Sequence, residues 1–299
     1  LWARYPLATD KCDLSACFVE LALRTAPRAL LVLPRALLSL ASWAAVRRAL
    51  LDAGLDAVLR LPDHTFDATV DAVLVAVAPA ARRRAGTADG ALAWTGPLAV
   101  GADAWSLAGP LPELPGLPLG RYVTVHMGVV CGDYDRYVHP GRLHPEDQPT
   151  CRGRDVARWD IADRGEFLRY LPREMLQRKP YVAPKRAALF DVPAKVVLAG
   201  TTGTVLRAAV DQARRFPLDS CYVLHPRRPD VDVHAVAGWL LSDPVGAWYA
   251  ARFPAARVKG VEVARIPVPP PPWPELADAA RARDDAGVDA AAAAAYARA

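Results

Sequence analysis

The first 79 residues alternate between helical and strand-like hydrophobic patterns. Residues 13–24 place apolar side chains at helical spacing behind Asp13, a capping residue. A short apolar run ends at Pro34, and a helical pattern over residues 39–54 ends at a glycine. Two strand-like runs follow, residues 55–61 and 70–77. The order helix, strand, helix, strand, strand predicts an α/β unit with an antiparallel hairpin closing its sheet.

The pattern changes after this first domain, residues 1–79. Residues 80–115 are polar and then rich in glycine and proline, which predicts a linker. A second domain, residues 116–272, is predicted from apolar alternation after Gly120, an apolar run at 194–200 and a helical pattern at 233–253. The alanine-rich end, residues 273–299, is predicted to be a tail forming a solvated or loosely docked helix.

Composition permits two hydrophobic cores but does not by itself identify a partner. The chain has 299 residues, 53% of them hydrophobic, and a net charge of +5 with a pI near 9.0. This charge favours a polyanionic partner, although it is common among ordinary proteins. The five cysteines have neither zinc-site spacing nor the density of a disulfide scaffold, which indicates a reducing cytoplasm. With no membrane span or signal peptide visible, we expect a cytoplasmic protein without a membrane partner.

Eight short motifs follow one another along the chain. They are DLSACFVE (13–20), LLVLP (30–34), TFDATVDAVLVAV (65–77), GLPLG (116–120), RGRDV (152–156), VVLAGTTGT (196–204), WLLS (239–242) and ARIPVP (264–269). In this order they resemble the TaqI-type adenine-specific DNA methyltransferases, from the closing part of the catalytic domain through the target-recognition domain. The resemblance covers about residues 14–269, and one departure is Ser15, where the family usually has tyrosine.

The resemblance implies both a fold and an activity. The fold is α/β, with the C-terminal part of a Rossmann-like methyltransferase sheet followed by a mixed α/β target-recognition domain. The activity is methyl transfer from S-adenosyl-L-methionine to the exocyclic amino group of an adenine flipped out of double-stranded DNA. The setting is restriction-modification or phage defence, and the resemblance allows an endonuclease, fused or separate, as a further partner.

Two aromatic side chains of the first domain occupy positions that have roles in that family. Phe66 is in the position for stacking on the flipped adenine, and stacking on an aromatic ring contributes about 1 to 3 kcal/mol per base. Phe18 resembles the residue that packs against the adenine of S-adenosyl-L-methionine. The alternatives are a core aromatic at the start of a strand for Phe66 and a helix core position beside Leu14 and Leu21 for Phe18. Glu20 is expected to be solvated.

DNA contacts are predicted in three parts of the second domain. Arg152, Gly153 and Arg154 form a turn in which guanidinium groups can bind phosphate or read guanine, and in which the glycine lets the backbone approach phosphate. The turn Thr201, Thr202, Gly203 and Thr204 offers hydroxyl and amide groups to phosphate. Lys185, Arg186 and Arg207 flank it and add positive charge. The alternatives are a solvated surface turn for the first segment and a plain hairpin for the second.

Some motifs of the family are absent from this sequence. The chain contains no asparagine, no Asn-Pro-Pro-Tyr-like segment near its start and no glycine-rich cofactor turn after a first strand. We therefore expect the cofactor-binding half and the catalytic loop to lie upstream of Leu1, and the chain not to methylate DNA alone. Two other functions stay open: a stand-alone DNA-binding specificity module without catalysis, and a decayed pseudo-enzyme.

Overall fold

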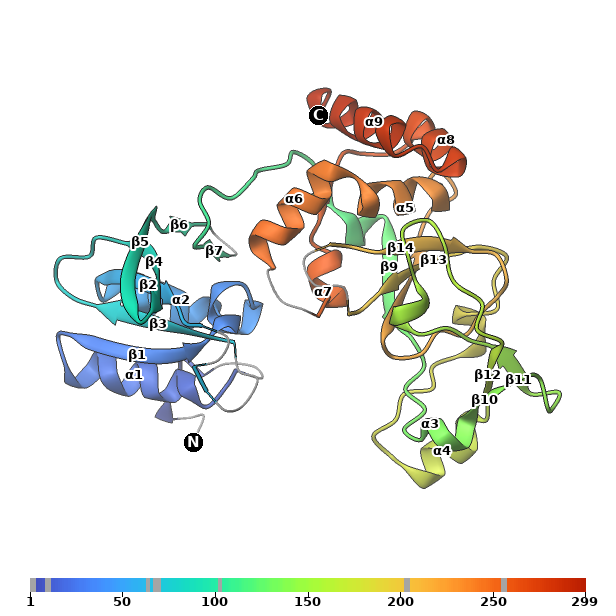
Figure 1. Ribbon diagram of the computed structural model, residues 1–299, viewed down its shortest axis with the longest axis horizontal. Helices are drawn as coiled ribbons and strands as arrows, with labels where there is room; N and C mark the ends of the chain where they lie inside the picture. The colour runs from blue at the N-terminus through green and yellow to red at the C-terminus, as the bar shows by residue number, and fades with distance from the viewer. Residues whose placement is uncertain are drawn as a thin grey trace. The chain divides into compact units, whose positions relative to one another are not determined.

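The chain divides between Pro112 and Glu113 into two units (Figure 1). The computed structural model describes residues 4–8, 12–62, 65–66, 71–101, 104–201, 205–253 and 257–299. The predicted segment TFDATVDAVLVAV is therefore described at its first two residues and from Asp71 onward, while residues 67–70 lie outside the described part.

The first unit is built on a sheet in the order β1-β3-β2-β4-β5. Its strands are β1 (Ala29–Pro34), β2 (Leu55–Arg60), β3 (Ala72–Val77), β4 (Arg84–Asp89) and β5 (Ala91–Pro97), with a small ribbon of β6 (Ala99–Val100) and β7 (Trp105–Ser106). Its helices are α1 (Ser15–Thr25) and α2 (Ala44–Asp52), with 3-10 turns η2 (Arg35–Leu38) and η3 (Ala41–Trp43). Strand β3 lies antiparallel between β1 and β2, so β2 and β3 pair as predicted. They lie in the middle of the sheet rather than closing it, because β4 and β5 continue it beyond β2.

The two helices cover one face of this sheet. Strand residues alternate between faces, so Leu33, Val73 and Val75 point into the core formed with α1 and α2. Leu30 and Val32 point to the opposite face, where their exposed fractions are 67% and 52%. Strand β1 is thus apolar on both faces, as in sheets that are covered on both sides, while the described helices of this unit cover one side.

Helix α1 turns the apolar stripe of its sequence away from the core of this unit. Leu14, Phe18 and Leu21 are exposed, whereas Ala16 and Val19 are fully buried. Small side chains allow α1 to lie close to β1, as Figure 1 shows, and leave the large ones outside. Glu20, which we expected to be solvated, is buried and accepts a hydrogen bond from the Leu7 amide at 2.9 Å.

The predicted linker instead carries two strands of the sheet. Strand β4 pairs parallel with β2, and β5 pairs antiparallel with β4. Asp56 on β2 attaches β4, because its carboxylate accepts hydrogen bonds from Arg82 Nε at 2.9 Å and Arg84 Nη2 at 3.0 Å. The Arg82 hydrogen bond, against the opposing effect of burial, lowers the pKa of Asp56 to about 2. Arg82 and Arg84, which gave this segment the polar character of a linker, form ion pairs with Asp56 of the sheet.

The second unit is built on an antiparallel sheet in the order β14-β13-β15-β9. Its strands are β8 (Leu117–Pro118), β9 (Val123–Met127), β10 (Val138–Pro140), β11 (Asp147–Pro149), β12 (Glu166–Arg169), β13 (Lys195–Ala199), β14 (Ala208–Asp211), β15 (Cys221–Pro226) and β16 (Pro267–Val268). Its α-helices are α3 (Tyr134–Tyr137), α4 (Pro172–Arg178), α5 (Val233–Leu241), α6 (Asp243–Arg252), α7 (Gly260–Val263), α8 (Pro274–Ala282) and α9 (Asp285–Ala297). Its 3-10 turns are η4 (Leu119–Arg121), η5 (Gly153–Asp155) and η6 (Ala187–Leu189).

The central strand β13 is buried on both faces. Val196 and Leu198 point to a core shared with α5, α6, α8 and α9, and Val197 and Ala199 point to a second core formed by the segments around β10, β11 and β12. The helix predicted over residues 233–253 is two helices, because the chain breaks at Ser242 and α6 begins at Asp243 with Pro244 in its first turn. The four-stranded sheet thus separates two layers. One is a helical layer made of α5, α6, α8 and α9, and the other is an irregular layer around β10, β11 and β12, which we call the polar layer after its charged surface.

The alanine-rich end is part of the helical core rather than the solvated or loosely docked helix that we expected. Helices α8 and α9 lie against α5, as Figure 1 shows, and bury Leu276, Val288 and Ala292. The Tyr296 hydroxyl donates to the Pro267 carbonyl at 2.7 Å. Alanine is small enough to let these helices pack closely. In the sequence, the same alanines indicate only a weakly hydrophobic helix.

The described part of the chain contains no helix long and apolar enough to cross a membrane. Within those same ranges, no cluster of three or more histidine, cysteine, aspartate or glutamate side chains could hold a metal ion. All five cysteines are free and buried. A hydrogen bond with Cys151, together with burial, raises the pKa of the Cys221 thiol well above its usual range, so the thiolate is disfavoured.

Candidate nucleic-acid interface

The polar layer of the second unit presents the short turn that contains Arg152, Gly153 and Arg154. The Arg152 amide donates to the buried Asp155 Oδ2 at 2.7 Å, and the Asp155 amide donates to the Arg152 carbonyl at 2.9 Å. These reciprocal bonds close the turn η5 and fix where its side chains leave the backbone. Aspartate therefore has a structural role in this turn, while the arginines project from it.

Arg152 is held in place by two neighbours. Its Nε donates to Glu166 Oε2 at 3.0 Å, and its guanidinium carbon lies 5.2 Å from the centre of the Tyr134 ring. The Tyr134 hydroxyl donates to Asp219, and burial together with that hydrogen bond raises the pKa of Tyr134, so the phenol stays neutral. Among the described residues, neither terminal nitrogen of Arg152 has a hydrogen-bond partner, so both can donate to a ligand.

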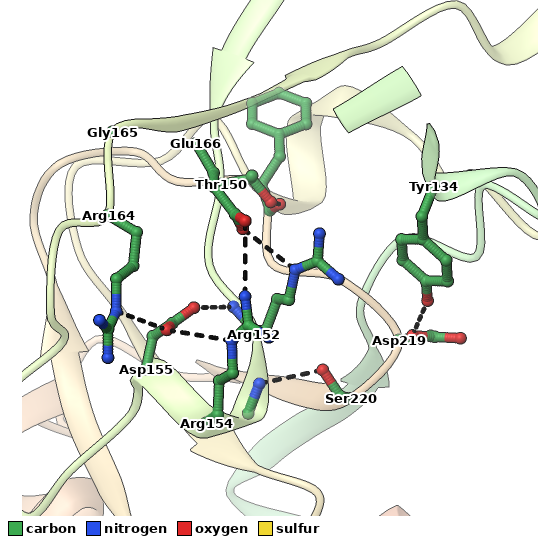
Figure 2. Close-up of polar contacts among 12 residues, drawn as sticks. Tyr134, Thr150, Arg152, Arg154, Asp155, Arg164, Gly165, Glu166, Asp219 and Ser220 are labelled. Atoms are coloured by element: carbon green, nitrogen blue, oxygen red, sulfur yellow. Dashed lines mark hydrogen bonds and ion pairs between the residues drawn. The ribbon is translucent and has the colours of Figure 1, made fainter. Parts of the chain in front are cut away.

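Arg154 and Arg164 both lie beside the Asp155 carboxylate, and Arg154 also reaches Glu166. Figure 2 shows Arg152, Arg154 and Arg164 gathered around Asp155 and Glu166. Asp155 Oδ1 lies 3.8 Å from Arg154 Nε and 3.3 Å from Arg164 Nε, and Arg154 Nη2 lies 3.5 Å from Glu166 Oε1. Three guanidinium groups and two carboxylates leave an excess of one positive charge on an exposed surface, which favours a polyanion.

Gly153 packs against a neighbouring loop rather than leaving its backbone open to phosphate. Its amide donates to Ser220 Oγ at 2.9 Å, and the residue is buried. The expected use of this amide for phosphate is therefore replaced by an internal hydrogen bond. The glycine allows close packing of the turn, and the flanking arginine side chains are what the turn presents outward.

Arg207 joins this turn to the predicted threonine-rich turn. Its Nη2 donates to the Thr201 carbonyl at 3.0 Å and lies 3.5 Å from the Gly153 carbonyl. Thr201 is exposed, while Thr202, Gly203 and Thr204 lie outside the described residues. The structure thus brings together Arg152, Gly153, Arg154, Thr201 and Arg207 of the residues that the sequence analysis selected.

Lys185 and Arg186 lie on a different segment, next to η6. Both are exposed, and the Lys185 carbonyl accepts a hydrogen bond from the Tyr170 hydroxyl at 2.6 Å. In the ranges that the structure describes, no hydrogen bond or ion pair connects either residue to the Arg152 turn. Their predicted contribution to DNA binding remains a prediction based on charge.

Phe66 and Phe18 belong to the first unit and are considered within it. Phe66 follows β2, 42% exposed and outside the core cluster of the first unit. Strands β1 and β2 both run antiparallel to β3, so they are parallel to each other and their carboxyl ends lie at the same end of the sheet. The connection that carries Phe66 begins at this end. Phe18 is 60% exposed in the first turn of α1, outside the core cluster of this unit.

Sequence reasoning missed Arg164, Glu166 and Tyr134. Glu166 begins β12 and Arg164 precedes it, ten or more residues after the recognised turn, so neither falls within a motif. The signal that was present is the alternation of arginine and acid along residues 152–166, which is typical of paired charges. Pairing across twelve positions depends on the fold and cannot be read from spacing.

Among known proteins, this chain is similar to solved structures in its fold, while its sequence matches none of the families or curated proteins compared. No protein-family model matches the sequence, and no curated protein sequence matches it. The chain is similar to the structure of the type IIL restriction-modification enzyme MmeI in complex with DNA, with 9% identity and a TM-score of 0.62 over 94% of this chain and 48% of that one. It is also similar to a DrdV–DNA complex, with 9% identity and a TM-score of 0.52 over 94% of this chain and 40% of that one. The chain thus spans about half the length of these structures. Its fold is related to that of restriction-modification enzymes.

Proposed function

We propose that this chain is the C-terminal portion of a site-specific DNA adenine methyltransferase of a restriction-modification or phage-defence system. The first unit completes the catalytic domain, and the second unit selects the DNA sequence. The reaction is methyl transfer from S-adenosyl-L-methionine to the exocyclic amino group of a flipped adenine. The main support for this proposal is the fold similarity, over 94% of the chain, to the restriction-modification enzyme MmeI, whose structure contains DNA.

The open apolar face of β1 supports this proposal. Strand β1 has exposed apolar side chains on the face that α1 and α2 leave open, and α1 exposes Leu14, Phe18 and Leu21. A sheet that is apolar on both faces is normally covered by helices on both. A cofactor-binding half, supplied by a segment that this sequence does not contain, would cover this apolar surface and continue the sheet beyond β1.

The described residues do not by themselves hold the cofactor. Phe18 offers one aromatic ring to the adenine of S-adenosyl-L-methionine, but the sequence has no glycine-rich cofactor turn after a first strand to bind the rest of that molecule. No step of methyl transfer is therefore assigned to a residue of this chain. Phe66, exposed at the carboxyl edge of the sheet, would hold the flipped base by stacking.

The second unit would bind the duplex through its arginine cluster. Arg152, Arg154 and Arg207 lie on one polar layer, and their guanidinium groups are oriented by carboxylates or carbonyls. Orientation before binding lowers the conformational entropy that the complex must lose. Such groups contribute both counterion release and directional hydrogen bonds to DNA.

The test is to express the complete natural polypeptide that contains this chain. Duplex DNA is incubated with S-adenosyl-L-methionine carrying a labelled methyl group, and N6-methyladenine is measured by mass spectrometry after digestion. We expect label in adenine at one recognition sequence, and methyl-cytosine or no label would contradict the proposal. If the 299-residue chain binds one duplex sequence but the complete polypeptide transfers no methyl group, the second candidate holds, a specificity module without catalysis.

A further inference from the structure

The polar layer contains an open pocket between the Arg152 turn and the edge of β10. Its volume is about 490 Å³, and it is lined by Val138, His139, Pro140, Arg154, Arg164 and Glu166. Strand β10 pairs with β12, where Pro140 lies opposite Glu166. Two cationic side chains and one anionic side chain thus share a single concave surface beside an apolar wall.

The two arginines of the pocket have donors to spare. Arg154 and Arg164 have side-chain exposures of 63% and 60%, yet Asp155, which is only 1% exposed, lies within ion-pair distance of both Nε atoms. Figure 2 shows Arg164 and Arg154 on either side of this carboxylate. Across the described ranges, the terminal nitrogens of Arg164 have no hydrogen-bond partner. A guanidinium held at Nε and open at its terminal nitrogens presents a fork to a ligand.

Glu166 decides what kind of ligand fits. Its carboxylate is 22% exposed and is fixed by Arg152 at 3.0 Å and Arg154 at 3.5 Å. A phosphate could accept from the two arginines, but it has no donor to offer this carboxylate. The major-groove edge of a G·C pair matches it, because guanine O6 and N7 accept from a guanidinium fork and the cytosine amino group donates to a carboxylate.

We propose that this pocket reads one G·C base pair, with Arg164 and Arg154 donating to guanine and Glu166 accepting from the cytosine amino group. The proposal rests on the proposed function in one respect, that the second unit binds duplex DNA. It adds a specific base pair and two residues, Arg164 and Glu166, that the resemblance did not indicate.

The test uses the whole 299-residue chain and a library of duplexes with a randomised region. Bound duplexes are recovered and sequenced for the unchanged chain and for Arg164→Lys, Arg164→Gln and Glu166→Gln. We expect the unchanged chain to select a sequence with a fixed G·C pair, and each variant to relax that pair by about 5- to 150-fold while keeping the other positions. Arg164→Lys keeps the charge but loses the fork, so it should relax the pair without changing the salt dependence of binding.

Arg298→Gln is the matched control, because Arg298 is exposed at the end of α9 in the helical layer and its loss should leave the selected sequence unchanged. Circular dichroism melting checks that each variant is folded.

Variants that lower recovery of all duplexes equally would overturn the proposal, since the pocket would then bind phosphate. A motif that the variants leave intact would also overturn it, although DNA recognition would stand. Absence of any duplex binding by the unchanged chain would overturn it together with DNA recognition, whereas a lack of methylation by the complete polypeptide affects only the proposed function.

Discussion

Gly153 lies so close to Ser220 that a β-carbon on the glycine would stand 2.5 Å from the Ser220 carbonyl oxygen. Because backbone atoms cannot yield cheaply, Gly153→Ala should move the turn that carries Arg152 and Arg154. We expect a loss of about 1 to 3 kcal/mol in the free energy of unfolding and a weaker affinity for duplex DNA. Thermal unfolding and fluorescence anisotropy with a labelled duplex measure the two effects.

Gly246→Ala is the control for that substitution. Gly246 lies within α6, and apart from its chain neighbours and the adjoining backbone of its own helix, no described atom lies within 4 Å of the position of an added β-carbon. Alanine should stabilise the helix by about 0.5 to 1 kcal/mol and leave DNA affinity unchanged. Equal unfolding temperatures for the Gly153→Ala variant and the unchanged chain would show that the turn adapts without cost, contrary to the prediction.

Arg207→Gln should weaken DNA binding for all sequences alike. Arg207 bonds to the carbonyls of Thr201 and Gly153, so its role is to add charge and to hold two turns together rather than to read a base. The slope of log affinity against log salt should become shallower by about 0.9, the value for one released counterion. Titrations at several salt concentrations measure this slope, with Arg298→Gln as the charge-matched control. A changed sequence preference at constant slope would assign Arg207 to base reading instead.

Phe66→Ala in the complete polypeptide should lower the methylation rate while duplex affinity stays within about twofold. The ring is exposed and outside the core, so its loss should change stability little, whereas base stacking worth about 1 to 3 kcal/mol corresponds to a rate loss of about 5- to 150-fold. Fluorescence of 2-aminopurine at the target position reports the flipped base. Phe66→Trp should retain stacking, and methylation that is unchanged in Phe66→Ala would remove this role.

Val32→Lys should improve the solution behaviour of the isolated chain and prevent it from joining a separately expressed cofactor-binding half. Val32 lies on the open face of β1, so a lysine there disturbs no described core contact, and charge on an edge strand opposes self-association. Light scattering measures self-association, and co-purification measures assembly. Val261→Lys, a change at an exposed position of the second unit, is the control. Assembly that survives Val32→Lys would show that this face is not the docking surface.

The stability of the second unit should rise with pH between about 5 and 7. Burial first, and then the nearby His126 and Lys195, lower the pKa of His225 below its usual value. The unfolded chain therefore takes up a proton that the folded chain resists, so the stabilising contribution is present above a pH of about 6.5 and is lost as pH falls below it. Chemical denaturation at several pH values measures this slope. His225→Gln should flatten it, and replacement of the exposed His144 should not.

The sequence predicted secondary structure best where a short run of apolar residues is bounded by polar, proline or glycine residues. Strands β1, β2, β3 and β13 lie close to their predicted positions, and the hairpin of β2 and β3 is as expected. The orientation of α1 was not predictable, because Leu14, Phe18 and Leu21 form a normal core stripe by spacing, and only the packed structure shows them on the outside.

Charge was the least predictable property. The arginines at 82 and 84 appeared to be a solvated linker but pair with Asp56 across the sheet, and Arg164 pairs with Asp155 across nine positions. A charged side chain looks the same in sequence whether its partner is water, a carboxylate or a phosphate. The candidate turn was found because its two arginines are adjacent to a glycine, whereas the carboxylate that orients them depends on the fold.

The burial of α8 and α9 has a practical consequence for exchanging DNA specificity between proteins. A graft that ended near Pro269, where the family-like motifs stop, would remove Leu276, Val288 and Ala292 from the core under α5 and leave that helix uncovered. The transplantable module therefore extends from Glu113 through Tyr296. A chimaera made at these boundaries transfers the polar layer together with the helical layer that supports it, so the core under α5 stays intact in the new protein.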